Sequence, residues 1–196
     1  MKKFYLVLLS VLMFSLLGCS EKTEDTNETS VVISKKGEIT NIIVESFLED
    51  YYTEDGLKTF FTEKIREYDS NPSDETGISL DSLVVADGIA KATLHFSNYK
   101  AYSEFYNTDF FYGTVNEAYD SGYIMDTTLK APRSSETISK ADLMKNADRT
   151  IIILSEPILV SAPKKIIYAS ANVEIIDEKH VRISSDSTGL AYILME

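Results

Sequence analysis

The amino-acid sequence predicts an α+β protein: an antiparallel β-sheet or meander with three or four short helices. Several short, β-branched runs alternate apolar with polar residues and are joined by turn residues, which is typical of antiparallel strands. A few other segments place apolar residues three and four positions apart, which predicts amphipathic helices. Strands and long helices do not alternate along the chain as a parallel sheet would require, so the antiparallel class is favoured.

Residues 1–18 have the character of a secretory signal peptide. Met1-Lys2-Lys3 is a short cationic head, and residues 4–17 form an uncharged, mostly apolar run. A membrane span needs about 20 apolar residues, which is longer than this run. We therefore expect residues 1–18 to direct export and then to be removed.

The end of this segment, Leu16-Leu17-Gly18-Cys19, resembles the lipobox of bacterial lipoproteins, in which a small residue leads into an invariant cysteine. The resemblance implies cleavage between Gly18 and Cys19 and acylation of the Cys19 sulfur, for example by palmitate, so that the lipid bilayer is a partner of the chain. It also implies a location at the outer face of the cell membrane. An ordinary cleaved signal is the alternative, but the one cysteine of the chain stands where the lipobox requires it.

Residues 19–30 are expected to be the lipidated cysteine and a flexible acidic tether. The stretch SEKTEDTNETS holds no apolar residue whose burial could offset the entropy of ordering it. Residues 31–196 are then expected to form a single α+β globular domain. With no second cysteine for a disulfide, this domain must be stabilised by its hydrophobic core.

The charge of the chain excludes several classes of partner. The sequence holds 19 basic and 31 acidic residues, a net charge of −12, and loss of Lys2 and Lys3 with the signal peptide would change it to −14. Such a surface repels nucleic acid, so no nucleic-acid partner is expected. Two separated histidines and one lipidated cysteine do not make a zinc site, and we expect neither a metal ion nor a cofactor.

Two hairpins are predicted in the first half of the mature chain. The runs at 31–33 and 39–44 are β-branched and flank a glycine-containing turn. The runs at 83–85 and 90–96 are joined by Asp87-Gly88, which is a strong signal for a tight hairpin turn.

Between the hairpins, Thr53 is placed to cap an amphipathic helix. The residues of its expected buried stripe are Leu57, Phe61, Ile65 and Tyr68.

The segment 96–123 is rich in aromatic residues. The chain has 12 tyrosines and 9 phenylalanines, and ten of these residues lie in this segment. Ser97 is placed to cap a helix over residues 98–107. At 100° per residue the aromatic side chains of this helix share one arc of about 120°, the width of a core-facing stripe, so we expect them to pack inward. Residues 110–112 are expected to form a short strand with at least one ring on each face. The candidate ligand contacts are Tyr102, Tyr106, Phe110, Phe111 and Tyr112.

A capping box at Thr114 to Glu117 predicts another short helix, which Gly122 is placed to stop. The run FFYGTVNEAYDSGY and the C-terminal half of the chain resemble uncharacterised envelope lipoproteins of Gram-positive bacteria. This resemblance carries no activity with it.

The C-terminal part is predicted to be mostly strand. Residues 124–139 are expected to be a loop or a boundary, and Ser139 is placed to cap a short helix that ends near Asn146. Short polar links separate six β-rich runs, which indicates an antiparallel meander. The runs lie at 150–154, 158–160, 165–168, 173–176, 181–183 and 190–194.

No recognisable set of nucleophile, base and orienting group points to an enzyme. The pattern Ser-x-x-Lys occurs at 97–100 and 161–164, as often as chance predicts, and His180 is interpreted as a surface histidine in a turn. We expect a membrane-anchored envelope lipoprotein that acts as a non-catalytic binding or structural module, with an envelope glycan or protein as partner. The alternative is a hydrolase that acts on cell-envelope polymers or peptides.

Overall fold

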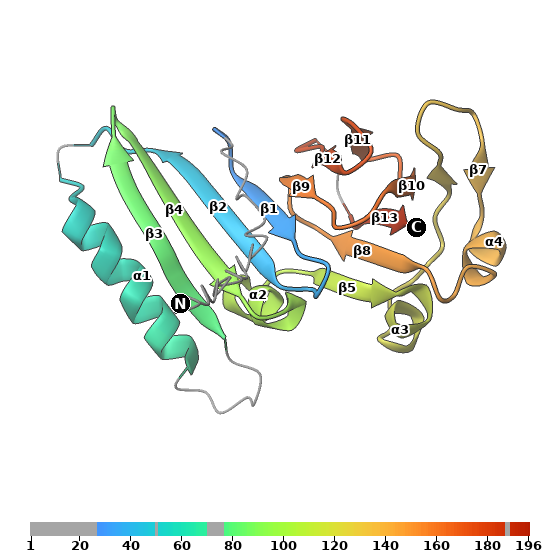
Figure 1. Cartoon of the computed structure of the whole chain (residues 1–196), viewed down its shortest axis with the longest axis horizontal. Coiled ribbons are helices and arrows are strands. Elements are labelled where there is room, and N and C mark those ends of the chain that lie inside the picture. Colours follow the sequence, from blue (N-terminus) through green and yellow to red (C-terminus); the bar gives the residue numbers. More distant parts are fainter. Residues whose placement is uncertain (1–26, 50, 70–76, 187–188) are drawn as a thin grey trace, which may run out of the picture.

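The computed structural model describes residues 27–49, 51–69, 77–186 and 189–196 (Figure 1). The predicted signal peptide, the lipobox with Cys19 and most of the predicted tether lie outside these residues. Within the described residues the chain forms four helices and thirteen strands in two mostly antiparallel sheets. The predicted α+β class is therefore confirmed.

Seven strands form the larger sheet, which we call the seven-stranded sheet. They are β1 (Ser30–Ile33), β2 (Ile39–Ser46), β3 (Ile78–Ala86), β4 (Ile89–Phe96), β9 (Leu159–Ser161), β11 (Val173–Ile175) and β12 (His180–Ile183). Their order across the sheet is β11-β12-β9-β1-β2-β4-β3, and β1 pairs with β9 in parallel. Both predicted hairpins, β1–β2 and β3–β4, are present.

The β3–β4 hairpin has the turn that its sequence predicts. Asp87 and Gly88 have φ angles of 52° and 74°, so both central residues are left-handed, as a type I′ turn requires. On β4, residues 90, 92, 94 and 96 are buried, whereas 91, 93 and 95 are partly exposed. The alternation that was predicted for this strand is therefore confirmed.

The remaining strands form the six-stranded sheet. They are β5 (Phe110–Thr114), β6 (Leu129–Lys130), β7 (Thr137–Ile138), β8 (Thr150–Leu154), β10 (Ile166–Ala169) and β13 (Ala191–Met195), in the order β5-β8-β13-β10-β6-β7. All six predicted C-terminal runs are strands, but they divide between the two sheets, and β11 and β12 are the one consecutive pair among β8–β13 that hydrogen-bonds. Their connectivity therefore differs from a simple meander. Residues 151–154 of β8 are all buried, so side chains on both faces of this strand are covered. This is expected of a central strand in a sheet that has a hydrophobic core on each face.

Four helices accompany the sheets in the described ranges. They are α1 (Glu54–Asp69), α2 (Tyr99–Tyr106), α3 (Val115–Asp120) and α4 (Lys140–Met144). Figure 1 shows α1 beside β3 at one end of the molecule, and α3 and α4 at the other. None of these helices has the length and apolar character needed to cross a membrane.

Two of the four predicted helix caps, Thr53 and Thr114, bond as predicted. Ser139 occupies the N-cap of α4, but its side chain makes no capping hydrogen bond to the backbone. Thr53 Oγ1 accepts a hydrogen bond from the Gly56 amide at 3.1 Å, and the capping box of Thr114 and Glu117 is formed. The cap of α2 is Asn98, whose side chain accepts from the Ala101 amide, and not Ser97. Ser97 instead continues the strand pairing, because its amide donates to the Gly77 carbonyl at 2.8 Å.

Two hydrophobic cores lie on opposite faces of the six-stranded sheet. The first fills the space between the two sheets and includes Phe110 and Ile152. The second lies beneath α3 and α4 and includes Phe111 and Ile153. Strand β5 therefore places one phenylalanine on each face, as predicted.

Residues 124–139 pack more closely than the predicted loop. Met125 and Leu129 are fully buried in the second core, and β6 pairs with β7 in a short antiparallel ladder. The sequence did not predict this packing, because the few apolar residues of the serine- and threonine-rich segment are too widely spaced to show a helical or strand periodicity.

Candidate functional site

The aromatic residues of α2, which include the candidate ligand contacts Tyr102 and Tyr106, pack inward as predicted. Tyr102 is buried, with its ring centroid 5.1 Å from that of Phe96 and 4.8 Å from that of Phe110. Tyr106 and Tyr112 are half-buried against the first core. Phe110 and Phe111 are buried on opposite sides of the six-stranded sheet, so the structure does not bring the five candidates together on one surface. Their role in ligand contact stays a prediction.

The hydroxyl groups of α2 already have partners within the protein. Tyr102 donates to Glu156 Oε2 at 2.8 Å, and Tyr106 donates to Asn41 Oδ1 at 2.6 Å. Burial raises the pKa of both phenols and of the Glu156 carboxyl. The rings and hydroxyls of α2 thus join the two sheets, and they leave little polar capacity for a ligand.

An aromatic cleft that the sequence analysis missed lies between the start of α1 and strands β2 and β4. We use this name for a cavity of about 520 Å³ that is lined mainly by apolar and aromatic side chains. Its aromatic lining consists of Phe47, Tyr51, Tyr52, Phe60 and Phe61. The exposed fractions of Tyr51, Tyr52 and Phe60 are 73%, 48% and 52%, so their rings are accessible from solvent.

The rings of the aromatic cleft support one another. Tyr52 stacks on Phe47 with a centroid distance of 5.3 Å, and Tyr51 meets Tyr52 edge-on at 4.6 Å. Contact with Tyr51, together with Coulombic repulsion from Glu49, raises the pKa of the Tyr52 hydroxyl, so this phenol stays protonated. Tyr51 and Tyr52 precede the helix cap, and Phe60 lies beside the predicted stripe. This excess of rings outside the stripe was the signal that could have indicated the cleft.

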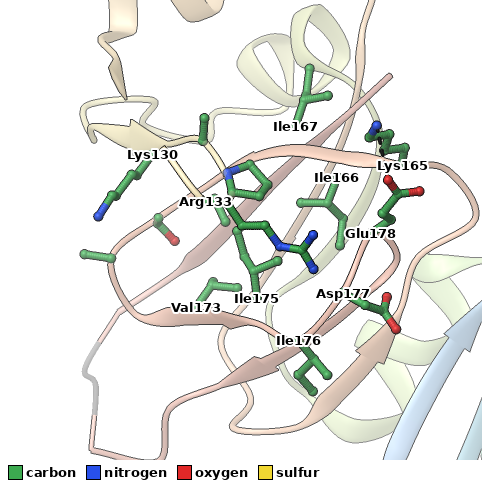
Figure 2. Close-up of a pocket in the computed structure, with 15 residues that line it drawn as sticks. Lys130, Arg133, Lys165, Ile166, Ile167, Val173, Ile175, Ile176, Asp177 and Glu178 are labelled. Atoms are coloured by element: carbon green, nitrogen blue, oxygen red, sulfur yellow. Dashed lines mark ion pairs between the residues drawn. The ribbon is translucent and has the colours of Figure 1, made fainter. Parts of the chain in front are cut away.

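A second cavity, the charged pocket, lies where β10 and β11 separate into different sheets. Its volume is about 570 Å³. It is lined by several isoleucines of the β10 and β11 region and by residues 130–133. Figure 2 shows the Arg133 guanidinium extending into this pocket, with Lys165 beside Glu178 at the rim. The ion pair between Lys165 and Glu178 measures 3.3 Å. An apolar body that carries an acidic group would suit this combination of isoleucines and a cation.

Three residues that the sequence analysis did not connect form a hydrogen-bonded chain, which reaches the charged pocket at its Asp177 end. Ser161 Oγ lies 3.2 Å from His180 Nε2, and His180 Nδ1 lies 2.7 Å from Asp177 Oδ2. Asp177 also lines the charged pocket. Their sequence positions gave no signal, because Ser161 and His180 meet through the non-sequential pairing of β9 with β12. His180 is at the surface as predicted, but it begins strand β12 instead of lying in a turn, and its ring has partners on both nitrogens.

The Ser-x-x-Lys patterns do not form the helical pair that such a motif needs. Ser161 lies on a strand, and Lys164 Nζ donates to Thr150 Oγ1 at 2.8 Å. Ser97 precedes α2, where it is not in the helix with Lys100. Among the described residues, no group of three or more histidine, cysteine, aspartate or glutamate side chains is arranged to hold a metal ion.

Comparison with known proteins does not place the chain in a family: no family model, no curated protein and no solved structure matches it. Evidence for the function of the chain therefore comes from the chemistry of its sites.

Proposed function

We propose that this chain is a lipoprotein at the outer face of the cell membrane, anchored through acylated Cys19, and that its folded part binds a neutral envelope glycan in the aromatic cleft. The lipobox supports the anchor, and the charge of the chain agrees with a role that involves no nucleic acid. The observation that carries the binding role is the exposure of the cleft's rings.

Exposed aromatic rings that converge on a cavity call for an explanation. Tyr51, Tyr52 and Phe60 each leave about half or more of their surface to solvent, although their neighbours Leu57 and Phe61 pack into the first core. Contiguous exposed apolar surface of this kind marks a binding site. Tyrosine suits a sugar because its ring stacks on the apolar face of a pyranose while its hydroxyl remains available for hydrogen bonding.

The charge around the aromatic cleft favours a neutral glycan over an anionic polymer. Glu45 lines the cleft, Glu49 acts electrostatically on Tyr52, and Glu54 and Asp55 flank lining residues at the start of α1. These carboxylates repel phosphate-rich polymers. They also accept hydrogen bonds, which suits the hydroxyl groups of a sugar.

Binding to N-acetylglucosamine oligomers tests this proposal. We expect the mature chain, purified in detergent, to bind chitotetraose in a calorimetric titration, and we expect Tyr51→Ala with Tyr52→Ala to weaken binding at least roughly tenfold, equivalent to about 1.4 kcal/mol. Tyr119→Ala is the matched control, because Tyr119 is 51% exposed but lies on α3, outside the cleft.

Two results would contradict the glycan proposal: equal binding by the double variant and the wild type, or no binding by the wild type. Sedimentation of the same samples shows whether the cleft instead joins two copies of the chain, since the double variant would then shift from dimer to monomer.

A further inference from the structure

Ser161 and His180 face each other across the ladder between β9 and β12. Their Cα atoms are register partners, and the side chains meet at 3.2 Å between Ser161 Oγ and His180 Nε2. The neighbouring register pair, Val160 and Val181, is fully buried in the first core. Because side chains alternate along a strand, Ser161 and His180 lie on the opposite, outer face of the seven-stranded sheet.

Asp177 orients the imidazole. Its Oδ1 accepts the amides of Lys179 and His180 at 2.7 and 2.9 Å, and its Oδ2 lies 2.7 Å from His180 Nδ1. The backbone bond to Lys179 and the bond to His180 hold the pKa of this carboxyl below its ordinary value, so it is a carboxylate acceptor. An acceptor at Nδ1 favours the tautomer with its proton there, which leaves Nε2 to accept the Ser161 hydroxyl proton.

From this geometry we infer that Ser161 is a nucleophile that accepts acyl groups from activated esters, with His180 as its base and Asp177 as the positioning residue. Ser161 Oγ attacks the ester carbonyl carbon, and the hydroxyl proton moves to His180 Nε2. The bond from that carbon to the leaving oxygen breaks, and the leaving group departs with the electron pair and takes the proton from His180. Water then releases the acyl group as a carboxylic acid by the same steps and restores the Ser161 hydroxyl.

The surroundings of Ser161 define the class of ester. The amide of Ala162 is committed to the Lys179 carbonyl at 2.8 Å, so it does not stabilise an oxyanion, and a good leaving group such as a phenolate is needed. Ile176 is exposed and donates its amide to the His180 carbonyl, so it provides an apolar contact beside the pair. Aryl esters of short apolar acids meet both conditions. This activity lies beyond the proposed binding role, and it favours the hydrolase alternative.

A matched pair on the same sheet provides an internal control. Ser79 and His95 are also register partners, on β3 and β4, and one is a serine opposite a histidine as at the inferred site. The Ser79 hydroxyl, however, donates to Asp81 Oδ1 at 2.7 Å instead of pairing with the imidazole. Ser79 therefore controls for a serine that lies opposite a histidine but is not hydrogen-bonded to it, unlike Ser161.

The test is covalent labelling of the mature chain in detergent with a fluorophosphonate probe, followed by peptide mapping by mass spectrometry. We expect the adduct on Ser161 of the wild-type protein. Asp177→Asn retains an oxygen for the two backbone amides but disturbs the tautomer, so labelling should slow at least tenfold, as it should in His180→Gln. Ser161→Ala should abolish labelling, and Ser79→Ala should leave it unchanged.

Peptide mapping of the unsubstituted protein keeps the inference falsifiable even where a variant fails to fold. Adduct on Ser161, together with hydrolysis of 4-nitrophenyl acetate that disappears in Ser161→Ala, would support it. An absence of label, label on another residue, or equal labelling rates in wild type and His180→Gln would overturn it. No glycan is present in these assays, so their failure leaves the aromatic cleft proposal standing.

Discussion

Glu156 is the carboxylate through which α2 contacts the link between β8 and β9. Burial raises its pKa, while the hydrogen bond from Tyr102 acts in the opposite direction and is the weaker effect. An acid whose pKa is higher in the folded state than its usual 4.5 binds its proton more tightly when folded. Its contribution to stability is therefore full below that value and is lost as the pH rises through the folded pKa.

Replacing Glu156 by an uncharged acceptor should remove this loss. In Glu156→Gln the side-chain oxygen can still accept the Tyr102 hydroxyl, but no charge is buried at neutral pH. We expect the melting temperature to rise by roughly 1–3 °C near pH 7, with little difference near pH 3, where the wild-type carboxyl is protonated in both states. Calorimetry at the two pH values measures this. A variant less stable than the wild type near pH 7 would contradict the sign.

Helix caps that depend on the next turn of the chain could be predicted from the sequence. A cap that depends on contacts with a distant segment could not. Thr53 and Thr114 act as caps because their hydroxyls need only the next turn of chain. Ser97 and Asn98 are both capable caps, and the sequence alone favoured the wrong one. The structure selects Asn98, because the Ser97 amide pairs with the Gly77 carbonyl and so extends the hairpin by one residue.

At the level of elements, the capping box of α3 permits a quantitative prediction. Thr114 Oγ1 accepts the Glu117 amide at 3.1 Å, and the Thr114 amide donates to Glu117 Oε2 at 2.7 Å. Thr114→Ala removes the first bond and should lower the free energy of unfolding by about 1 kcal/mol. Ser139→Ala is the control, because Ser139 occupies the N-cap of α4 without a side-chain bond to the backbone. Urea unfolding should show the smaller effect for Ser139→Ala, and equal effects would argue against the cap.

Strand pairing shows the same division between local and distant information. The β1–β2 and β3–β4 hairpins followed from turn residues and alternation within a few positions. The parallel pairing of β1 with β9 joins residues 30–32 to 159–161, and no turn signal connects them. The Ser161 site depends on the equally distant pairing of β9 with β12, so its residues could be seen in the sequence but not brought together.

At the scale of the whole molecule, the packing of the helices and sheets decides which aromatic rings face solvent. The inward packing of the rings of α2 was predicted from their shared arc of about 120° and is confirmed. The structure places the rings of α2 between the two sheets, and it leaves Tyr51, Tyr52 and Phe60 exposed around the aromatic cleft. The exposure of Tyr51, Tyr52 and Phe60 depends on how the start of α1 packs against β2 and β4, so the spacing of residues in that segment did not predict it.

Membrane attachment of the whole chain should depend on Cys19. We expect wild-type protein in the membrane fraction with an acylated cysteine by mass spectrometry, because two or more acyl chains suffice to hold a protein on a bilayer. Cys19→Ala should give an uncleaved or released protein. A mature wild-type protein found in the soluble fraction with a free thiol would contradict the anchor.

The most direct test of the binding proposal is to locate the glycan on the protein. The mature chain, with isotope-labelled carbon in its tyrosine rings, is titrated with chitotetraose in detergent micelles. NMR spectra of this titration report on each phenol separately. We predict that the resonances of Tyr51 and Tyr52 shift together with increasing glycan while that of Tyr119 stays still. Shifts confined to Tyr102, Tyr106 and Tyr112, or no shift in any tyrosine, would contradict the assignment of the aromatic cleft as the binding site.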